Sequence, residues 1–151
     1  MMLGQTTGIR VGDRVIGMQA SQTVHVGPGM LGRVIDGLGR PIDGKGPMLD
    51  LVPRELDPRP VWAMRRVPIT RPMHTGVRAI DLMTTLGRGQ RMGIFAGPGV
   101  GKSTLLGSIA RNCSSDVNVL ALIGERGREV KDFIEGVLGP EGLARSVVVV
   151  S

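Results

Sequence analysis

A glycine-rich loop that runs into Lys-Ser-Thr constrains the fold of this chain more than any other feature. The run is Gly97-Pro98-Gly99-Val100-Gly101-Lys102-Ser103-Thr104. Glycines at this spacing let backbone N–H groups turn inward together around an oxyanion, and a following helix adds the partial positive charge of its N-terminus at the same point. The pattern, known as Walker A, therefore predicts a phosphate-binding loop that opens a helix.

The positions of this motif have separate predicted roles. Lys102 is expected to reach the β- and γ-phosphates of a nucleotide, and the Ser103 hydroxyl to complete the shell of a Mg²⁺ ion. Thr104 is the less favoured metal contact because Ser103 stands next to the lysine. Ala96 replaces the first glycine of the strict motif, and its small side chain still suits the turn. A plain glycine turn that caps a helix is the competing interpretation, since the chain holds 24 glycines.

The residues around the loop alternate between apolar strands and amphipathic helices. The expected elements are a buried strand at 91–96, a helix at 102–112, a strand covered on both faces at 117–123, a helix at 130–138 and a buried strand at 146–151. Gly139-Pro140 is expected to end the second helix, because glycine can turn left-handed and proline cannot continue a helix. Strand and helix in alternation predict an α/β fold with a parallel sheet and crossover helices.

The first half of the chain has a different composition. Residues 1–26 hold two strand-like pieces, at 13–18 and 22–26, whose alternating pattern suits an antiparallel pair. In the next stretch, residues 27–72, seven of the chain's ten prolines lie between Pro41 and Pro72, and Asp-Gly and Asp-Pro turn signals recur. This stretch is expected to be a connector rich in proline and glycine.

A carboxylate follows the strand expected at 117–123. Ligands of open α/β sheets bind beyond the carboxyl ends of the strands, and the phosphate loop leaves the same end of its own strand. Glu125 is therefore expected to orient the water that attacks the γ-phosphate, and Arg126 to neutralise charge on the transferred phosphoryl group. The competing interpretations are a solvated turn carboxylate for Glu125 and a local ion pair for Arg126.

The composition limits other classes of function. The formal net charge is +6, but the chain has one tryptophan, two phenylalanines and no tyrosine. Single-stranded nucleic acid is usually bound by stacking bases on aromatic rings, so no nucleic-acid partner is predicted, and attraction to acidic lipid is the favoured interpretation of the charge. Cys113 is the single cysteine, which excludes an intrachain disulfide framework and suits a reducing cytosol.

These motifs together resemble the flagellar and type III secretion export ATPases, which are similar to the catalytic subunit of rotary ATP synthases. The resemblance rests on residues 26–34, 39–43, 75–81, 87–97, 105–107 and 122–130. Residues 131–135 and 144–149 lean toward the flagellar branch. Glu125 matches the catalytic glutamate of this family and Arg126 the arginine beside it.

The resemblance implies a small N-terminal β-barrel that ends within residues 1–26. Residues 27–151 are then the first part of a RecA-like ATP-binding P-loop domain, and its sheet is expected to be incomplete. The family assembles as a homo-hexamer, uses ATP and Mg²⁺, and works with secretion apparatus proteins and export substrates or chaperones. The implied location is the cytoplasm, with peripheral contact at the inner membrane.

The implied function is ATP hydrolysis that drives export of protein substrates through a bacterial flagellar or type III secretion apparatus. The alternative is the catalytic subunit of a proton-translocating rotary ATP synthase, although Gly127 and the Lys102-Ser103-Thr104-Leu105 run favour the export branch. An RNA-translocating ring is disfavoured by the few aromatic residues, and a catalytically silent regulatory subunit is disfavoured by Glu125.

The Walker B aspartate, the arginine finger and the adenine pocket of this family match no part of the 151 residues. The chain is therefore expected to be a fragment of a longer protein and to hydrolyse no ATP by itself.

Overall fold

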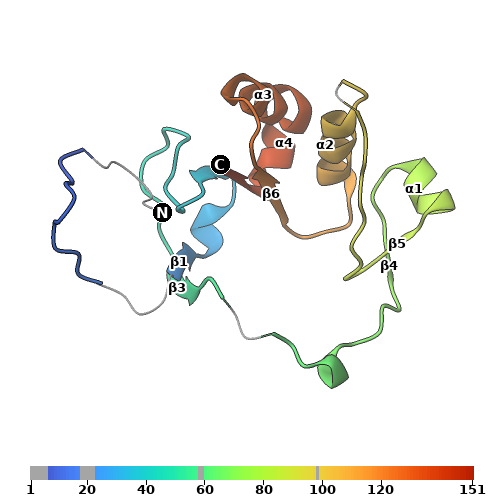
Figure 1. Cartoon of the computed structure of the whole chain (residues 1–151). Helices are drawn as coiled ribbons and strands as arrows, with labels where there is room; N and C mark the ends of the chain where they lie inside the picture. Colours follow the sequence, from blue (N-terminus) through green and yellow to red (C-terminus); the bar gives the residue numbers. More distant parts are fainter. Residues whose placement is uncertain (1–6, 18–22, 58–59, 98) are drawn as a thin grey trace.

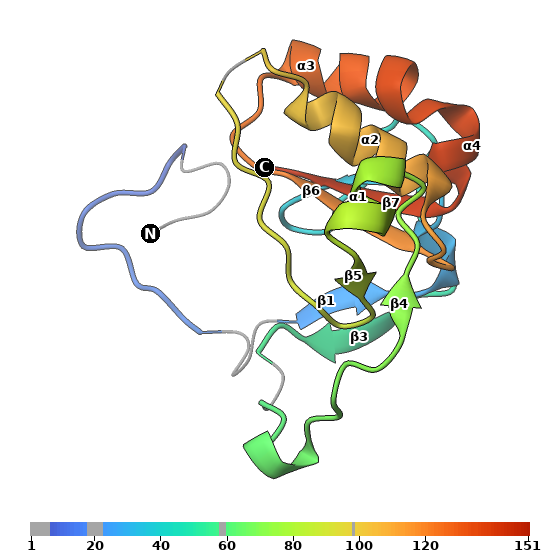
Figure 2. The same cartoon turned by 90° about the vertical axis from the view of Figure 1, so that its right-hand side faces the viewer.

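A parallel sheet with the strand order β2-β7-β6 forms the centre of the fold (Figure 2). The computed structural model describes residues 7–17, 23–57, 60–97 and 99–151. The strands are β2 (Arg33–Asp36), β6 (Asn118–Leu122) and β7 (Ser146–Val150). Val148 of the middle strand lies opposite Val34 on one side and Leu120 on the other. The predicted α/β class with a parallel sheet is confirmed.

One face of this sheet is covered by helices, as Figures 1 and 2 both show. The helical elements are α2 (Lys102–Asn112), α3 (Gly127–Asp132), the π-helix η3 (Phe133–Leu138) and α4 (Gly139–Ala144). Between them and the sheet lies the main apolar cluster, made of Val34, Ala110, Leu120, Leu122, Val130, Phe133, Leu138 and Val148. Removing this apolar surface from water supplies the main driving force for packing the helices on the sheet.

The opposite face of β6 is open, which corrects the expectation of a strand covered on both faces. Along the strand, burial alternates, so that Leu120 and Leu122 are buried whereas Val119 is 71% exposed. Successive strand residues point to opposite faces, and the helices described above pack on one face only. Continuous apolar sequence indicated a strand correctly but did not show which face is covered.

The segment before the phosphate loop is not a strand, which makes the prediction for residues 91–96 wrong. Residues 91–97 have no regular secondary structure, and Phe95 is 96% exposed. In the described part of the chain, β6 ends the sheet on this side and pairs with β7 alone. A β-strand is defined by hydrogen bonds to a neighbouring strand, and apolar sequence cannot replace that neighbour.

The helix predicted at 130–138 is confirmed, but the chain does not leave helical structure after it. Gly139 has a φ of 68°, as expected for a residue that ends a helix. Pro140 then lies in the first turn of α4, where the missing N–H of proline costs nothing because it has no partner within the helix. The Gly-Pro pair therefore separates two helices.

The N-terminal half pairs differently from the prediction. Strand β1 (Thr23–Val26) runs antiparallel to β3 (Val52–Glu55), with His25 opposite Pro53. Residues 13–17 form no strand, and position 18 lies outside the described residues. The expected pairing of 13–18 with 22–26 is therefore wrong. The strand that pairs with β1 is β3, which lies in the region expected to be a connector. Strand β2 lies in that region too.

The remaining elements are short. They are η1 (Pro28–Met30), which lies between β1 and β2, and η2 (Ala63–Arg65), β4 (Pro72–Met73), α1 (Arg78–Met83) and β5 (Leu86–Gly87), which lie between β3 and the phosphate loop. Strand β4 pairs antiparallel with β5. Among the described residues, no helix has both the length and the apolar character needed to cross a membrane.

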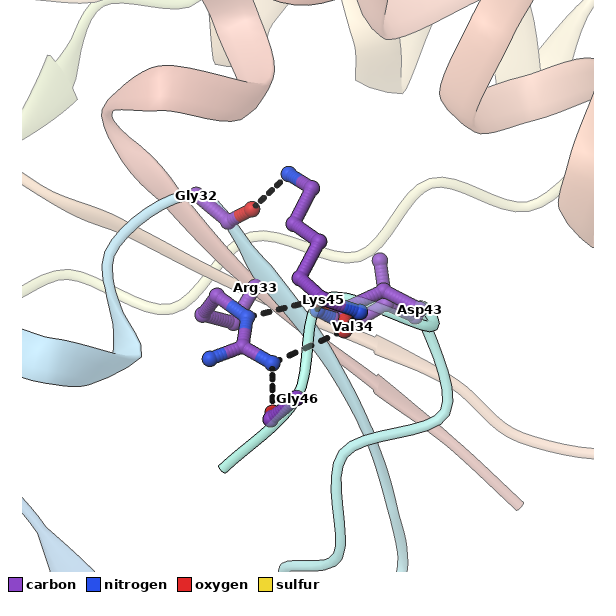
Figure 3. Close-up of polar contacts among 6 residues, drawn as sticks. All are labelled: Gly32, Arg33, Val34, Asp43, Lys45 and Gly46. Carbon is purple, nitrogen blue, oxygen red and sulfur yellow. Dashed lines mark hydrogen bonds and ion pairs between the residues drawn. The ribbon is translucent and has the colours of Figure 1, made fainter. Parts of the chain in front are cut away.

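A partly buried ion pair ties the loop after β2 back onto that strand (Figure 3). The Arg33 guanidinium donates two hydrogen bonds to the Asp43 carboxylate, from Nε at 2.7 Å and from Nη2 at 2.9 Å. The Val34 N–H donates to the same carboxylate at 3.1 Å, and Lys45 Nζ donates to the Gly32 carbonyl at 3.0 Å. The hydrogen bonds from Arg33 are the main reason that the pKa of Asp43 lies well below its ordinary value.

We predict that Asp43→Asn destabilises the protein at neutral pH by about 1 to 2 kcal/mol, because the charged hydrogen bonds weaken while water still screens part of the pair. A carboxyl whose folded pKa is lowered stabilises the fold above its unfolded pKa of about 3.9 and loses this effect as the pH falls. Denaturant unfolding at pH 7 and pH 3 measures the difference, which should shrink at pH 3. Asp116→Asn is the control, because Asp116 is exposed. An equal loss of stability in Asp43→Asn at both pH values would contradict the role given to the ion pair.

Candidate nucleotide-binding site

The phosphate loop, residues 97–104, opens helix α2 as the sequence predicted. Gly99 and Gly101 have φ values of 76° and 95°, in the left-handed region that favours glycine. Gly101 is the residue before the first helical position, Lys102, and its carbonyl accepts the N–H of Leu105 at 2.9 Å. The N–H groups at the start of α2 are therefore free to bind an anion. Pro98 lies outside the described residues.

A cleft lies between this loop and the start of α3. Its larger part has a volume of about 640 Å³ and is lined by Ala96, Gly97, Gly99, Gly101, Lys102, Ser103, Thr104, Glu125, Glu129, Asp132, Phe133 and Val137. The smaller part, of about 360 Å³, is lined mainly by apolar side chains from residues 92–94, α2, β6 and α3. Lys102, Ser103 and Glu125 line both parts. The two parts are therefore adjacent and share these side chains.

The structure brings together most of the residues that the sequence singled out. Lys102, Ser103 and Thr104 come from the first turn of α2, and Glu125 comes from the loop after β6. Val100 is 70% exposed and lies outside the lining of the cleft. Glu125 follows the carboxyl end of β6, where ligands of parallel sheets bind, and the phosphate loop lines the same cleft although the segment before it is not a strand.

Arg126 is not among the residues that line the cleft. Its side chain is 88% exposed, and the guanidinium lies 3.7 Å from the carboxylate of Glu129 on the next turn. An exposed pair of this kind contributes little to stability. The local ion pair considered for Arg126 is thus the arrangement observed, and a contact with phosphate requires Arg126 to leave Glu129.

Two carboxylates of the cleft were missed by the sequence analysis. Glu129 and Asp132 lie on α3, and Glu129 lines both parts of the cleft. Their spacing of three residues places them on one side of a helix. The sequence holds a signal for them, because a helix that begins beside Glu125 carries its first acidic residues into the same cleft.

The charges of the cleft suit a nucleotide together with a divalent cation. Glu125, Glu129 and Asp132 provide three carboxylates, against the single ammonium of Lys102. A phosphate anion alone meets more negative than positive charge here, whereas Mg²⁺ restores the balance. Carboxylate and hydroxyl oxygens are the hard ligands that Mg²⁺ prefers, and Ser103 supplies a hydroxyl beside the lysine. The residues present therefore fit a magnesium–nucleotide complex.

A glycine loop that opens a helix and faces carboxylates across a cleft, at the carboxyl edge of a parallel sheet, defines a P-loop protein of the α/β class. Residues 76–151 match the nucleotide-binding domain of the ATP synthase alpha/beta family. The chain belongs to this family.

Comparison with individual proteins shows which members of this family the chain is similar to. The chain is 56% identical over 149 residues to the type 3 secretion system ATPase of Xanthomonas euvesicatoria, covering 97% of this chain and 33% of that protein. It is 52% identical over 149 residues to the flagellum-specific ATP synthase of Treponema pallidum, covering 99% and 33%. The expected resemblance to flagellar and type III secretion ATPases is confirmed. With identities this close, the lean toward the flagellar branch stays a prediction.

A solved structure shows the same fold. The assembled ATPase EscN of enteropathogenic E. coli, in complex with its central stalk EscO, superimposes with a TM-score of 0.79 at 49% identity. The match covers 86% of this chain and 32% of the EscN chain. The chain thus spans about a third of the length of the relatives it matches, which agrees with the expectation that it is part of a longer protein.

Proposed function

We propose that the full-length protein is an ATPase that drives export of protein substrates through a bacterial flagellar or type III secretion apparatus. The observation that carries this proposal is the cleft, in which Lys102, Ser103 and Glu125 face a common space. The names of the relatives support the export system, since those compared are a type 3 secretion ATPase and a flagellum-specific ATP synthase. The domain assignment proposed with it is the end of a β-barrel at 1–26 and the first part of a RecA-like domain at 27–151.

In this proposal the phosphates of ATP lie against the phosphate loop. The loop amides and the N-terminus of α2 bind phosphate oxygens, Lys102 contacts the β- and γ-phosphates, and Ser103 binds Mg²⁺. Mg²⁺, when bound, neutralises charge on the phosphates. Most of the affinity then comes from backbone groups and Lys102, so binding does not depend on Glu125.

Glu125 acts on the attacking water. Its carboxylate accepts a hydrogen bond from the water and orients it toward the γ-phosphate. Arg126, released from Glu129, stabilises negative charge on the transferred phosphoryl group. Glu129 and Asp132 add negative charge to the cleft and so strengthen its preference for ATP bound with Mg²⁺ over ATP alone.

The partners proposed for the full-length protein are further copies of itself in a homo-hexamer, other proteins of the secretion apparatus, and export substrates or chaperones. The assembled state and central stalk named for EscN support this proposal. We propose a cytoplasmic location with peripheral contact at the inner membrane, and no nucleic-acid partner.

Phosphate release by the purified full-length protein tests the enzymatic part. Release should require Mg²⁺, disappear in Lys102→Ala, and rise more than linearly with protein concentration as the ring assembles. Release that is independent of Mg²⁺ or survives Lys102→Ala would refute the proposed site. In cells, a deletion strain should lose flagellar or type III export and regain it with the wild-type gene only.

A catalytic subunit of a proton-translocating rotary ATP synthase is the alternative, favoured by the family match itself. Proton uptake by inverted membrane vesicles separates the two. If the protein is an export ATPase, vesicles from the deletion strain should pump protons on addition of ATP as well as wild-type vesicles do. Loss of this pumping would favour the rotary synthase.

A further inference from the structure

Helix α2, which carries the phosphate loop, touches η3 at a glycine. Gly107 is buried in the middle of α2, and a Cβ atom built on it overlaps Cγ1 of Val137, with Val137 Cβ at 3.4 Å and Val137 O at 3.5 Å. Ordinary carbon–carbon contacts lie near 3.5 to 4.0 Å. The two helices are therefore as close as a glycine allows and closer than any other residue permits.

A second contact holds the same residue of η3. The Arg111 guanidinium donates a hydrogen bond to the Val137 carbonyl. Gly107 and Arg111 are four residues apart on α2, so they lie on one face of the helix. Val137 is thus held by its side chain against Gly107 and by its carbonyl to Arg111. The β-branched side chain of valine has little freedom to rotate in a helix, so this contact is stiff.

This contact lies in the wall of the cleft. Val137 and Phe133, both on η3, line the larger part, beside Lys102 and Ser103 from α2. The helix η3 continues α3 without interruption, and α3 carries Glu129 and follows Glu125. Figures 1 and 2 both show α2 side by side with this run of helices. The spacing between α2 and η3 therefore determines the distance between the phosphate loop and the carboxylates.

We infer that Gly107 and Val137 are positioning residues, whose contact sets the distance between the phosphate loop and Glu125 and so aligns the attacking water. The inference rests on the proposed ATPase function and adds the element that fixes the geometry of the site. Phosphate binding belongs to α2 and to the loop that opens it, which are joined by the hydrogen bond from the Leu105 N–H to the Gly101 carbonyl. The alignment of Glu125 depends on a second segment, α3 and η3, so a change of spacing affects turnover rather than binding.

Gly107→Ala in the full-length protein tests this separation. The added methyl must push α2 and η3 apart by roughly 1 Å, and a misplacement of that size can cost about 100-fold in rate. We expect kcat to fall roughly 10- to 100-fold while the Kd for magnesium nucleotide stays within about threefold. Alanine has the higher helix propensity of the two residues, so a loss cannot be attributed to a weaker helix.

A compensating variant and a control complete the experiment. Gly107→Ala with Val137→Ala removes the overlapping methyl groups and should recover most of kcat. Gly136→Ala lies on η3 at an exposed position with open space around it and should leave kcat and Kd within about twofold of wild type. A folded Gly107→Ala protein with wild-type kcat, an equal loss of kcat and affinity, or no recovery in the double variant would overturn the inference.

Two further outcomes, an unfolded Gly107→Ala protein and a failure of the proposed ATPase function, can be told apart from a failure of this inference. If Gly107→Ala yields no folded protein, Val137→Ile presses on the same contact from the other side. A kcat lowered at least fivefold with unchanged Kd supports the inference, and an unchanged kcat overturns it. If wild-type protein itself shows no hydrolysis that depends on Lys102, the proposed function fails. Hydrolysis in wild type with no effect at this contact overturns the present inference alone.

Discussion

Glu125→Gln in the full-length protein should lower kcat by roughly 10²- to 10⁴-fold, the range lost when a positioned general base is removed. Glutamine keeps the shape of the side chain but not its negative charge, so it cannot polarise the attacking water. The affinity for magnesium nucleotide should stay within about threefold, because the phosphates are held by the loop amides, Lys102 and Ser103. Steady-state turnover and calorimetric titration on the same preparation measure both quantities.

The control for this prediction is Glu135→Gln. Glu135 lies on η3, its carboxylate is 3.8 Å from Lys131, and it is not among the residues that line the cleft. Removing its charge should change kcat by no more than about twofold, as is usual for exposed substitutions. Turnover near the wild-type rate in Glu125→Gln would assign Glu125 to the solvated turn that the sequence also allowed.

Lys102→Ala should act on binding itself. The lysine is the single ammonium in a cleft with three carboxylates, so its loss removes a charged contact and leaves unbalanced negative charge. A hydrogen bond to a charged group contributes about 1.5 to 3 kcal/mol, which corresponds to a roughly 10- to 100-fold weaker Kd for magnesium nucleotide. Hydrolysis should become undetectable at the nucleotide concentrations that saturate wild type.

Lys131→Ala is the matched control, because Lys131 is an exposed lysine on α3 that pairs with Glu135. It should leave the Kd within about twofold of wild type. Equal affinities of Lys102→Ala and wild type, measured by the same titration, would show that the phosphates bind elsewhere.

Elements with a strong local pattern were predicted well from the sequence. Helix α2 has the predicted bounds because a glycine precedes it and its apolar side chains recur with helical spacing. Strand β7 was found because four consecutive valines suit a buried strand. In both elements the residues themselves favour the observed structure, so no distant partner had to be identified.

Elements that depend on distant partners were not predicted. Strand β2 has only Val34 and Ile35 as apolar residues and joins the sheet through β7, more than a hundred positions later in the chain. Residues 91–96 have the more strand-like sequence but lack a neighbouring strand among the described residues. Hydrogen-bond pairing between distant segments decided both outcomes, and local pattern carries little information about it.

In the site too, features set by local sequence were predicted and features set by packing between segments were not. The positions of Lys102 and Ser103 follow from a local motif, and that of Glu125 follows from the rule that parallel strands end at one edge of a sheet. The orientation of Arg126 toward Glu129, and the entry of Asp132 into the cleft, depend on how α3 begins and packs. Side-chain direction on a helix follows from its starting residue, which sequence locates only to within a few positions.

A structure of the full-length protein with Mg²⁺ and a non-hydrolysable ATP analogue tests the proposed nucleotide site. We expect phosphates within hydrogen-bond distance of Lys102 Nζ and the loop amides, Mg²⁺ in contact with the Ser103 hydroxyl, and the Glu125 carboxylate one water away from the γ-phosphate. A nucleotide bound outside the cleft, or a Glu125 carboxylate turned away from the γ-phosphate, would contradict the proposed site.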